Sequence, residues 1–210
     1  IFLTLIFIYI ASFSFSIFEV FSISIKKNRD QKWLDNRKKE KILAVKEGYL
    51  PVFNPSLVAK IKDKTPPIYP IGSLPYTKTY LCNEGYGLIT YLSDRFGLRN
   101  SDEKWVNINN QSNIFLIGDS YINGECVPKN ATISSKIESS TKINTINLGM
   151  GGNSPYEYRA IIKSIVSPII KNSNKENKVV LFFYINDNIL YDSSRELLLD
   201  STKSILNSSL

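Results

Sequence analysis

Three short apolar runs in the second half of the chain constrain its fold more than any other feature. They are residues 114–117, 143–147 and 179–183, and each leads within a few residues into glycine or polar side chains. The spacing of apolar residues predicts helices at 131–140, 155–170 and 194–206. Short apolar strands that alternate with helices are typical of an α/β domain. The third run is continuously apolar, which predicts a parallel sheet covered on both faces.

The N-terminus carries a second apolar feature. Residues 1–18 contain no charged side chain, and residues 20–25 are again mostly apolar after Glu19. A transmembrane helix needs about 20 apolar residues, so we predict a membrane anchor at 1–25. A buried core helix and a cleaved signal peptide are the alternatives. The first fits less well because this span is apolar on every face, and the second because no clear cleavage site follows it.

The positive charge of the chain is concentrated directly after this span. The formal net charge is +7, and residues 26–41 hold eight basic and three acidic side chains. This pattern indicates a juxtamembrane segment, and no nucleic-acid-binding motif accompanies it. Six of the nine prolines lie between residues 48 and 80, which predicts an extended linker or a segment that wraps over the surface. We therefore divide the chain into an anchor (1–25), a basic segment and linker (26–79) and an α/β domain (80–210).

The chain contains no histidine, the usual general base at neutral pH. Its two cysteines, Cys82 and Cys126, lack the spacing of metal ligands, so we expect no zinc site. Nothing in the sequence indicates an organic cofactor or an oligomeric state.

Each predicted strand is followed by a loop whose residues could take part in catalysis. The first is followed by Gly118-Asp119-Ser120, the second by residues 147–153 with three glycines, and the third by residues 185–188, which include Asn186. Parallel strands deliver their carboxyl ends to one edge of the sheet. A serine, a glycine-rich backbone and an amide side chain would therefore meet there. Acyl transfer needs such a set, namely a nucleophile and donors aimed at the oxyanion.

These three segments resemble the blocks of the SGNH (GDSL-type) hydrolases. NIFLIGDSYINGECV resembles the first block, NLGMGGNSP the second and FFYINDN the third. The resemblance implies that Ser120 is the nucleophile and that Gly152 and Asn186 are oxyanion donors. Tyr184 stands where many members have glycine. The upstream YLSDRFGLRNSDEKW is similar to the lead-in of membrane-associated bacterial members.

The resemblance implies a three-layer, flavodoxin-like sheet and ester hydrolysis through an acyl-serine. The substrate would be a small-molecule or glycan ester, for example an O-acylated sugar, a lipid or an envelope polymer. The family's fourth block, D-x-x-H, supplies the base and is absent here, so we expect the chain to be truncated and inactive as it stands. The alternative is a non-catalytic binding or scaffold protein on the same fold.

The resemblance also places the domain outside the cytoplasm of a bacterium, on the periplasmic side of the inner membrane. The basic cluster argues for the opposite orientation by the positive-inside rule. We give the resemblance more weight, because the residues before Ile1 that a charge comparison needs are missing. In such a compartment Cys82 and Cys126 would form a disulfide that holds the lead-in against the active-site edge. Two separate buried thiols are the alternative.

Simpler roles compete with the catalytic ones. Ser120 could be a helix N-cap, and Gly149, Gly151 and Gly152 could serve only a tight turn. Asn186 could be a turn residue. We expect Asp119 to be structural.

Overall fold

The structure is a computed structural model of the 210-residue chain and describes residues 25–52, 71–84 and 87–183. Residues 1–24 of the predicted anchor, the predicted helix at 194–206 and Asn186 lie outside these ranges, so they stay predictions. Within the described ranges, no helix is both long and apolar enough to cross a membrane. The chain divides into two compact units, Ile1–Leu43 and Ala44–Leu210.

The basic segment forms a helix at residues 25–46. Most of its side chains are exposed, and the Arg37 guanidinium lies 4.6 Å from the centre of the Trp33 ring. Gly48 ends the helix at φ +84°, and its N–H donates to the Val45 carbonyl at 3.0 Å. A left-handed glycine at this position is the usual helix stop.

A small sheet forms from the lead-in and the start of the linker. Its strands are β1 (Leu50–Pro51), β2 (Lys78–Cys82) and β3 (Ile89–Leu92), in the order β1-β2-β3. β1 runs parallel to β2, and β3 runs antiparallel to it. Both described ends of the linker also pack on the domain, since Val52 and Ile71 contact its main core.

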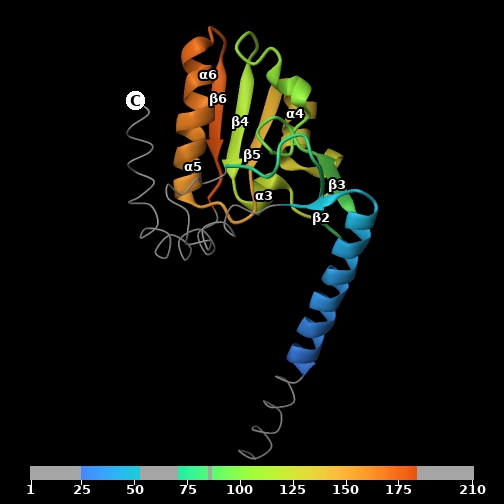
Figure 1. The fold of residues 1–210 in the computed structure, drawn as a ribbon. Coiled ribbons are helices and arrows are strands. Elements are labelled where there is room, and N and C mark those ends of the chain that lie inside the picture. The colour runs from blue at the N-terminus through green and yellow to red at the C-terminus, as the bar shows by residue number, and fades with distance from the viewer. Residues whose placement is uncertain (1–24, 53–70, 85–86, 184–210) are drawn as a thin grey trace, which may run out of the picture. The chain divides into compact units, whose positions relative to one another are not determined.

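The main sheet contains the three predicted strands. They are β4 (Asn113–Gly118), β5 (Asn144–Gly149) and β6 (Asn177–Leu181), in the order β5-β4-β6 (Figure 1). β4 pairs in parallel with both neighbours, and all three carboxyl ends therefore lie at one edge. The prediction of a mixed α/β fold with a parallel sheet is confirmed.

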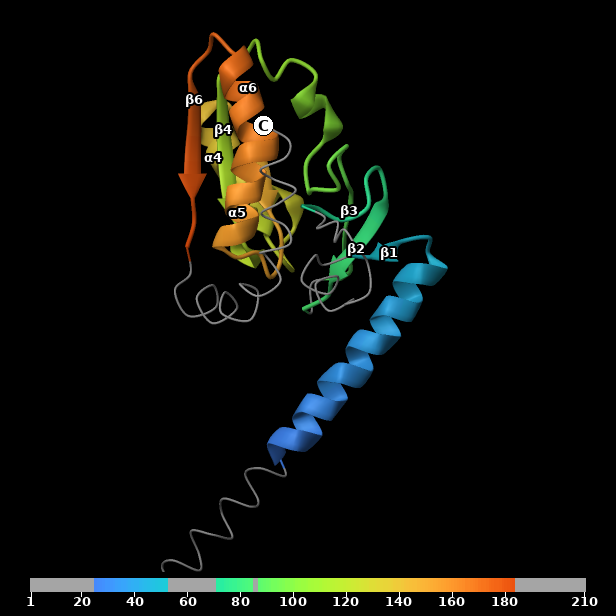
Figure 2. The same cartoon turned by 60° about the vertical axis from the view of Figure 1, so that its left-hand side comes forward.

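Helices cover opposite faces of this sheet (Figure 2). Alternate residues of β4 divide between the faces, since successive side chains of a strand point to opposite sides. Ile114 and Leu116 pack with Ile122 and Ile137 of α3 (Ser120–Asn123) and α4 (Ile133–Thr141). Phe115 and Ile117 pack against the long helix that joins β5 to β6, in a cluster with Ile146, Leu148, Tyr158, Ile161 and Ile165.

The joining helix is less regular than its sequence predicts. It consists of α5 (Pro155–Ile161), a π-helical turn (Ile162–Val166) and α6 (Ser167–Asn172). Pro168 has no N–H for the Ser164 carbonyl, and its ring would collide with that carbonyl in a regular helix. The wider π turn directly before it accommodates the proline.

Two further boundaries differ from the prediction. A 3₁₀ turn (Lys129–Ala131) precedes α4, and Thr132 separates the two as N-cap, its hydroxyl accepting from the Ser135 N–H at 3.2 Å. Another 3₁₀ turn (Asp102–Trp105) leads into β4.

The full covering expected for the third strand is not seen in the described part: Val179, Val180 and Leu181 are 39–45% exposed, because β4 is the one strand paired with β6 there.

We expect Phe115→Ala to destabilise the domain by about 3–5 kcal/mol, because the ring is fully buried at the centre of the sheet. Val106→Ala is the control; Val106 is 68% exposed, and its truncation should change the free energy of unfolding by less than ~0.5 kcal/mol. Denaturant unfolding followed by circular dichroism measures both. Equal effects of the two substitutions would contradict this account of the core.

Candidate functional site

The carboxyl ends of β4 and β5 each finish in a glycine, and these glycines are paired in register, Gly118 with Gly149. A side chain at either position would collide with α3. A Cβ at Gly118 would lie 2.5 Å from the Ile122 side chain, and one at Gly149 would lie 2.4 Å from the Asn123 backbone nitrogen. The two glycines therefore let the short helix α3 sit directly against the edge of the sheet.

Ser120 is the first residue of α3 and is partly exposed. Asp119, not Ser120, is the N-cap: its carboxylate accepts from the Tyr121 N–H at 3.0 Å. The N-cap interpretation of Ser120 is therefore wrong, and the structural role expected for Asp119 is confirmed. Within the described part of the chain, the Ser120 hydroxyl makes no hydrogen bond, so it is not committed to holding the fold.

Gly152 lies three residues beyond the end of β5, at the same edge of the sheet as Ser120. Its φ of +80° is in the left-handed region that favours glycine, which confirms the tight turn. The Met150 N–H donates to the Gly118 carbonyl at 3.3 Å, so the start of this loop is bonded directly to the end of β4. After the loop, the Glu157 carboxylate accepts from the Ser154 N–H at 2.5 Å and fixes the start of α5.

The end of β6 also reaches this edge. The Phe182 N–H donates to the Ile117 carbonyl at 2.9 Å, and the Phe182 ring lies 6.0 Å from the Tyr121 ring, centre to centre. Asn186, four residues further on, is outside the described residues. The structure therefore brings Ser120 and Gly152 to one edge, while the convergence of Asn186 and the predicted cleft stay predictions.

A buried polar cluster that the sequence did not reveal supports the edge from the lead-in side. At its centre is Asp94, which is fully buried and accepts from four donors at 2.8–2.9 Å: the N–H groups of Phe96 and Leu98, the Asn100 amide and the Trp105 indole. Burial raises the pKa of the Asp94 carboxyl, and the hydrogen bonds oppose that rise by stabilising the charged form.

Asn100 connects this cluster to β5. Its side chain accepts from the Asn147 N–H at 2.8 Å and donates to the Asn147 carbonyl at 2.9 Å. The lead-in thus pairs with β5 as a strand would, through one amide side chain.

The Asn147 side chain continues the connection to α3. It donates to the Ile122 carbonyl at 2.7 Å and accepts from the Gly149 N–H at 2.9 Å. In return, the Asn123 side chain donates to the Gly149 carbonyl at 3.1 Å. Two asparagines therefore lock the helix that begins with Ser120 to the loop that leads to Gly152.

Arg99 contacts the same helix from the other side. It is 7% exposed, and its guanidinium donates to three backbone carbonyls at the end of α3 and in the loop after it: Asn123 at 3.3 Å, Gly124 at 2.6 Å and Val127 at 2.7 Å. Burial lowers the pKa of Arg99. Burial also raises the pKa of the neighbouring Tyr91 to about 12, although the Arg99 cation acts in the opposite direction.

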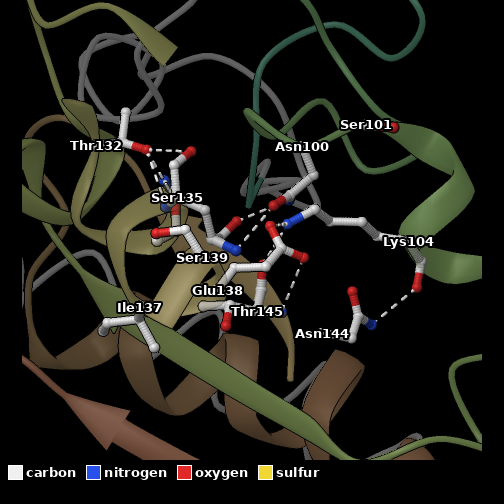
Figure 3. Close-up of polar contacts among 12 residues, drawn as sticks. Asn100, Ser101, Lys104, Thr132, Ser135, Ile137, Glu138, Ser139, Asn144 and Thr145 are labelled. Atoms are coloured by element: carbon white, nitrogen blue, oxygen red, sulfur yellow. Dashed lines mark hydrogen bonds and ion pairs between the residues drawn. The ribbon is translucent and has the colours of Figure 1, made fainter. Parts of the chain in front are cut away.

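Lys104 ties the lead-in to the amino end of β5 (Figure 3). Its ammonium donates to the Glu138 carboxylate at 2.6 Å and to the Thr145 carbonyl at 2.8 Å, while its own carbonyl accepts from the Asn144 amide at 3.1 Å. These contacts lie far from the carboxyl edge along β5, so we assign them to the fold rather than to the site.

Cys82 and Cys126 form a disulfide, with their Cα atoms 5.3 Å apart. The predicted bond is therefore confirmed, and the alternative of two separate thiols is wrong. It joins β2 to the loop after α3, the same loop that Arg99 holds. Both cysteines are buried, together with Leu81 and Ile89.

A shallow hollow on the surface lies elsewhere. It is lined by Lys129, Asn130, Ser135, Lys136 and Ser139, on α4 and the turn before it. Ser120 and Gly152 are not among these residues, so the hollow is separate from the candidate site.

Comparison with known proteins adds no assignment, since no family model, curated protein or solved structure matches this chain.

The disulfide generates a direct chemical prediction. In denaturant without reductant, alkylation should label neither cysteine, and after reduction it should label both. Replacing both cysteines by serine should lower the free energy of unfolding by about 2–4 kcal/mol, because the unfolded chain regains the freedom that the cross-link removes. Free thiols in the unreduced protein would contradict the bond.

Proposed function

We propose that this chain carries the nucleophile and oxyanion half of an SGNH-type serine esterase. The observation that supports it best is the state of Ser120. The residue is partly exposed at the carboxyl edge of a parallel sheet, and its hydroxyl makes no hydrogen bond in the described region, where Asp119 caps the helix instead. A serine in that position is available for chemistry.

In the proposed reaction, the Ser120 Oγ attacks the ester carbonyl carbon and its proton passes to a general base. The negative charge on the tetrahedral oxygen is stabilised by the backbone N–H groups of Ser120 and Gly152 and by the Asn186 amide. The Ser120 N–H belongs to the first turn of a helix, where no intrahelical acceptor is available. The intermediate collapses, and the protonated base gives its proton to the leaving alcohol. The base then takes a proton from water, which attacks the acyl group and releases the acid as Ser120 regains its proton. Removing one oxyanion donor typically lowers the rate by about 10²–10³.

In the SGNH family the general base is the histidine of the D-x-x-H block, and these 210 residues contain no histidine. A D-x-x-H segment encoded further along the reading frame is the source we propose. The proposal requires no metal or organic cofactor.

The finer features of the proposal are taken from the resemblance to the SGNH hydrolases. They are a three-layer, flavodoxin-like sheet, an N-terminal membrane anchor and a domain outside the cytoplasm, acting on a small-molecule or glycan ester. The disulfide supports an oxidising compartment, since such bonds are rare in the cytosol.

One observation favours a second candidate, a non-catalytic SGNH-fold module that binds its ligand at the membrane. This observation is the absence of histidine from the chain, because a module without the usual general base could bind an ester but not hydrolyse it. A complete gene without any downstream D-x-x-H would favour this candidate, and a gene with one would favour the esterase.

Imidazole can test the proposal on the chain itself, by standing in for the missing base. With p-nitrophenyl acetate, we expect an acetyl group on the peptide that contains Ser120, at a rate that rises with the concentration of neutral imidazole. General-base assistance of this kind contributes about 10²–10⁴ in enzymes, and a free base should supply a small part of it. Mass spectrometry after digestion measures the adduct.

Ser120→Ala is the control for reaction at other side chains and for hydrolysis by imidazole alone. Asn186→Ala should slow the acylation of Ser120 more than it raises the half-saturating ester concentration, because the donor acts on the transition state. Acetylation that is equal with and without the Ser120 hydroxyl would sink the esterase proposal.

A further inference from the structure

The loop after α3 is held by a cation that has no acidic partner in the described part of the chain. The hydrogen bonds of the Arg99 guanidinium go to three backbone carbonyls, all within residues 123–127. The guanidinium also lies 5.6 Å from the centre of the Tyr91 ring. The planar fork of an arginine suits several carbonyls at once, whereas a lysine is a single point of charge. A buried charge is costly unless its partners are fixed in place, so this arrangement requires the loop to keep one conformation.

The loop in turn fixes the backbone of Ser120. The Ser120 carbonyl accepts from the N–H groups of Gly124 and Glu125, both at 3.0 Å, and the Gly124 carbonyl accepts from Arg99. One peptide unit therefore separates the Arg99 guanidinium from the hydrogen bonds of Ser120. On its far side, the loop is bound to β2 through the Cys82–Cys126 disulfide.

The same contact extends to the glycine loop. Asn123, whose carbonyl accepts from Arg99, uses its side chain to bond the Gly149 carbonyl at 3.1 Å. Gly149 ends the strand that leads to Gly152. Moving the loop would therefore change the position of Ser120 relative to the backbone that would receive the oxyanion.

We propose that Arg99 is a positioning residue, which sets the place of Ser120 relative to the Gly149–Gly152 loop by holding residues 123–127. Arg99 touches neither the substrate nor the reacting atoms, and its role in catalysis rests on the proposed esterase function. Because Arg99 belongs to the lead-in, this segment would contribute to the geometry of the site as well as to the fold.

Amide hydrogen exchange tests the geometric part of this proposal directly. The N–H groups of Gly124 and Glu125 report on the carbonyl of Ser120, and those of Phe115 and Leu116 report on the sheet. In Arg99→Met, exchange at Gly124 and Glu125 should rise by at least about tenfold while the two sheet amides keep their protection. Arg99→Lys, which keeps the charge but not the fork, should resemble Arg99→Met.

Arg95→Met is the matched control. Arg95 belongs to the same lead-in and makes two guanidinium bonds to Asp102, at 3.0 and 2.9 Å, with no contact to the loop after α3. Its removal should leave exchange at Gly124 and Glu125 unchanged. The proposal is overturned if Arg95→Met loosens these amides equally, if lysine restores full protection, or if the Arg99 variants lose protection throughout the molecule.

The imidazole-assisted acylation of Ser120 separates this proposal from the function on which it rests. Arg99→Met should lower the acylation rate by roughly tenfold or more with little change in the half-saturating ester concentration, as expected for a misplaced nucleophile. Loosened Gly124 and Glu125 amides with an unchanged rate would overturn the catalytic role of Arg99. Absence of any Ser120 adduct in the unmodified chain would instead overturn the esterase function, whatever the exchange data show.

Discussion

The parallel pairing of β4 with β5 is the constraint on which the rest of the domain depends. Six residues pair in register, from Asn113 with Asn144 to Gly118 with Gly149. Because side chains alternate across a strand, this register decides which residues enter each of the two cores, and a shift by one residue would exchange them. The same register makes the two strands end together. The loops that carry Ser120 and Gly152 consequently begin side by side.

Strand pairing brings the loops together, but polar side chains hold their relative position. Asn147 and Asn123 cross between α3 and the end of β5, and Asn100 bonds both backbone groups of Asn147. Buried amides of this kind are stabilising when every donor and acceptor is satisfied and costly when one is left unpaired. Such a network favours the one arrangement in which its buried amides are all hydrogen-bonded. The proposed site would need this accuracy to place its donors.

The sequence predicted the elements of the main domain well and the support of its site poorly. β4, β5 and β6 were visible because each is a short apolar run, and the position of Ser120 followed from the strand that precedes it. Asp94, Arg99 and Asn100 gave no comparable signal. They are polar and lie in a loop, and Arg99 and Asn100 bond to residues 24 to 47 positions further along the chain. The exposure of β6 likewise depends on tertiary packing, which local periodicity does not encode. The π turn follows from Pro168, which the spacing of apolar residues does not reveal.

In the proposed esterase, the described residues would position Ser120 without activating it. A serine hydroxyl is a weak nucleophile until a base takes its proton. The nearest carboxylate in sequence, Asp119, is buried and already accepts from the Tyr121 N–H, so proton transfer to it would weaken the helix cap that aligns Ser120. The charged groups of the lead-in are similarly committed, Asp94 to four donors and Arg99 to three carbonyls. In the proposed esterase, positioning and activation would therefore be separate tasks, and the residues that perform the first are unsuited to the second.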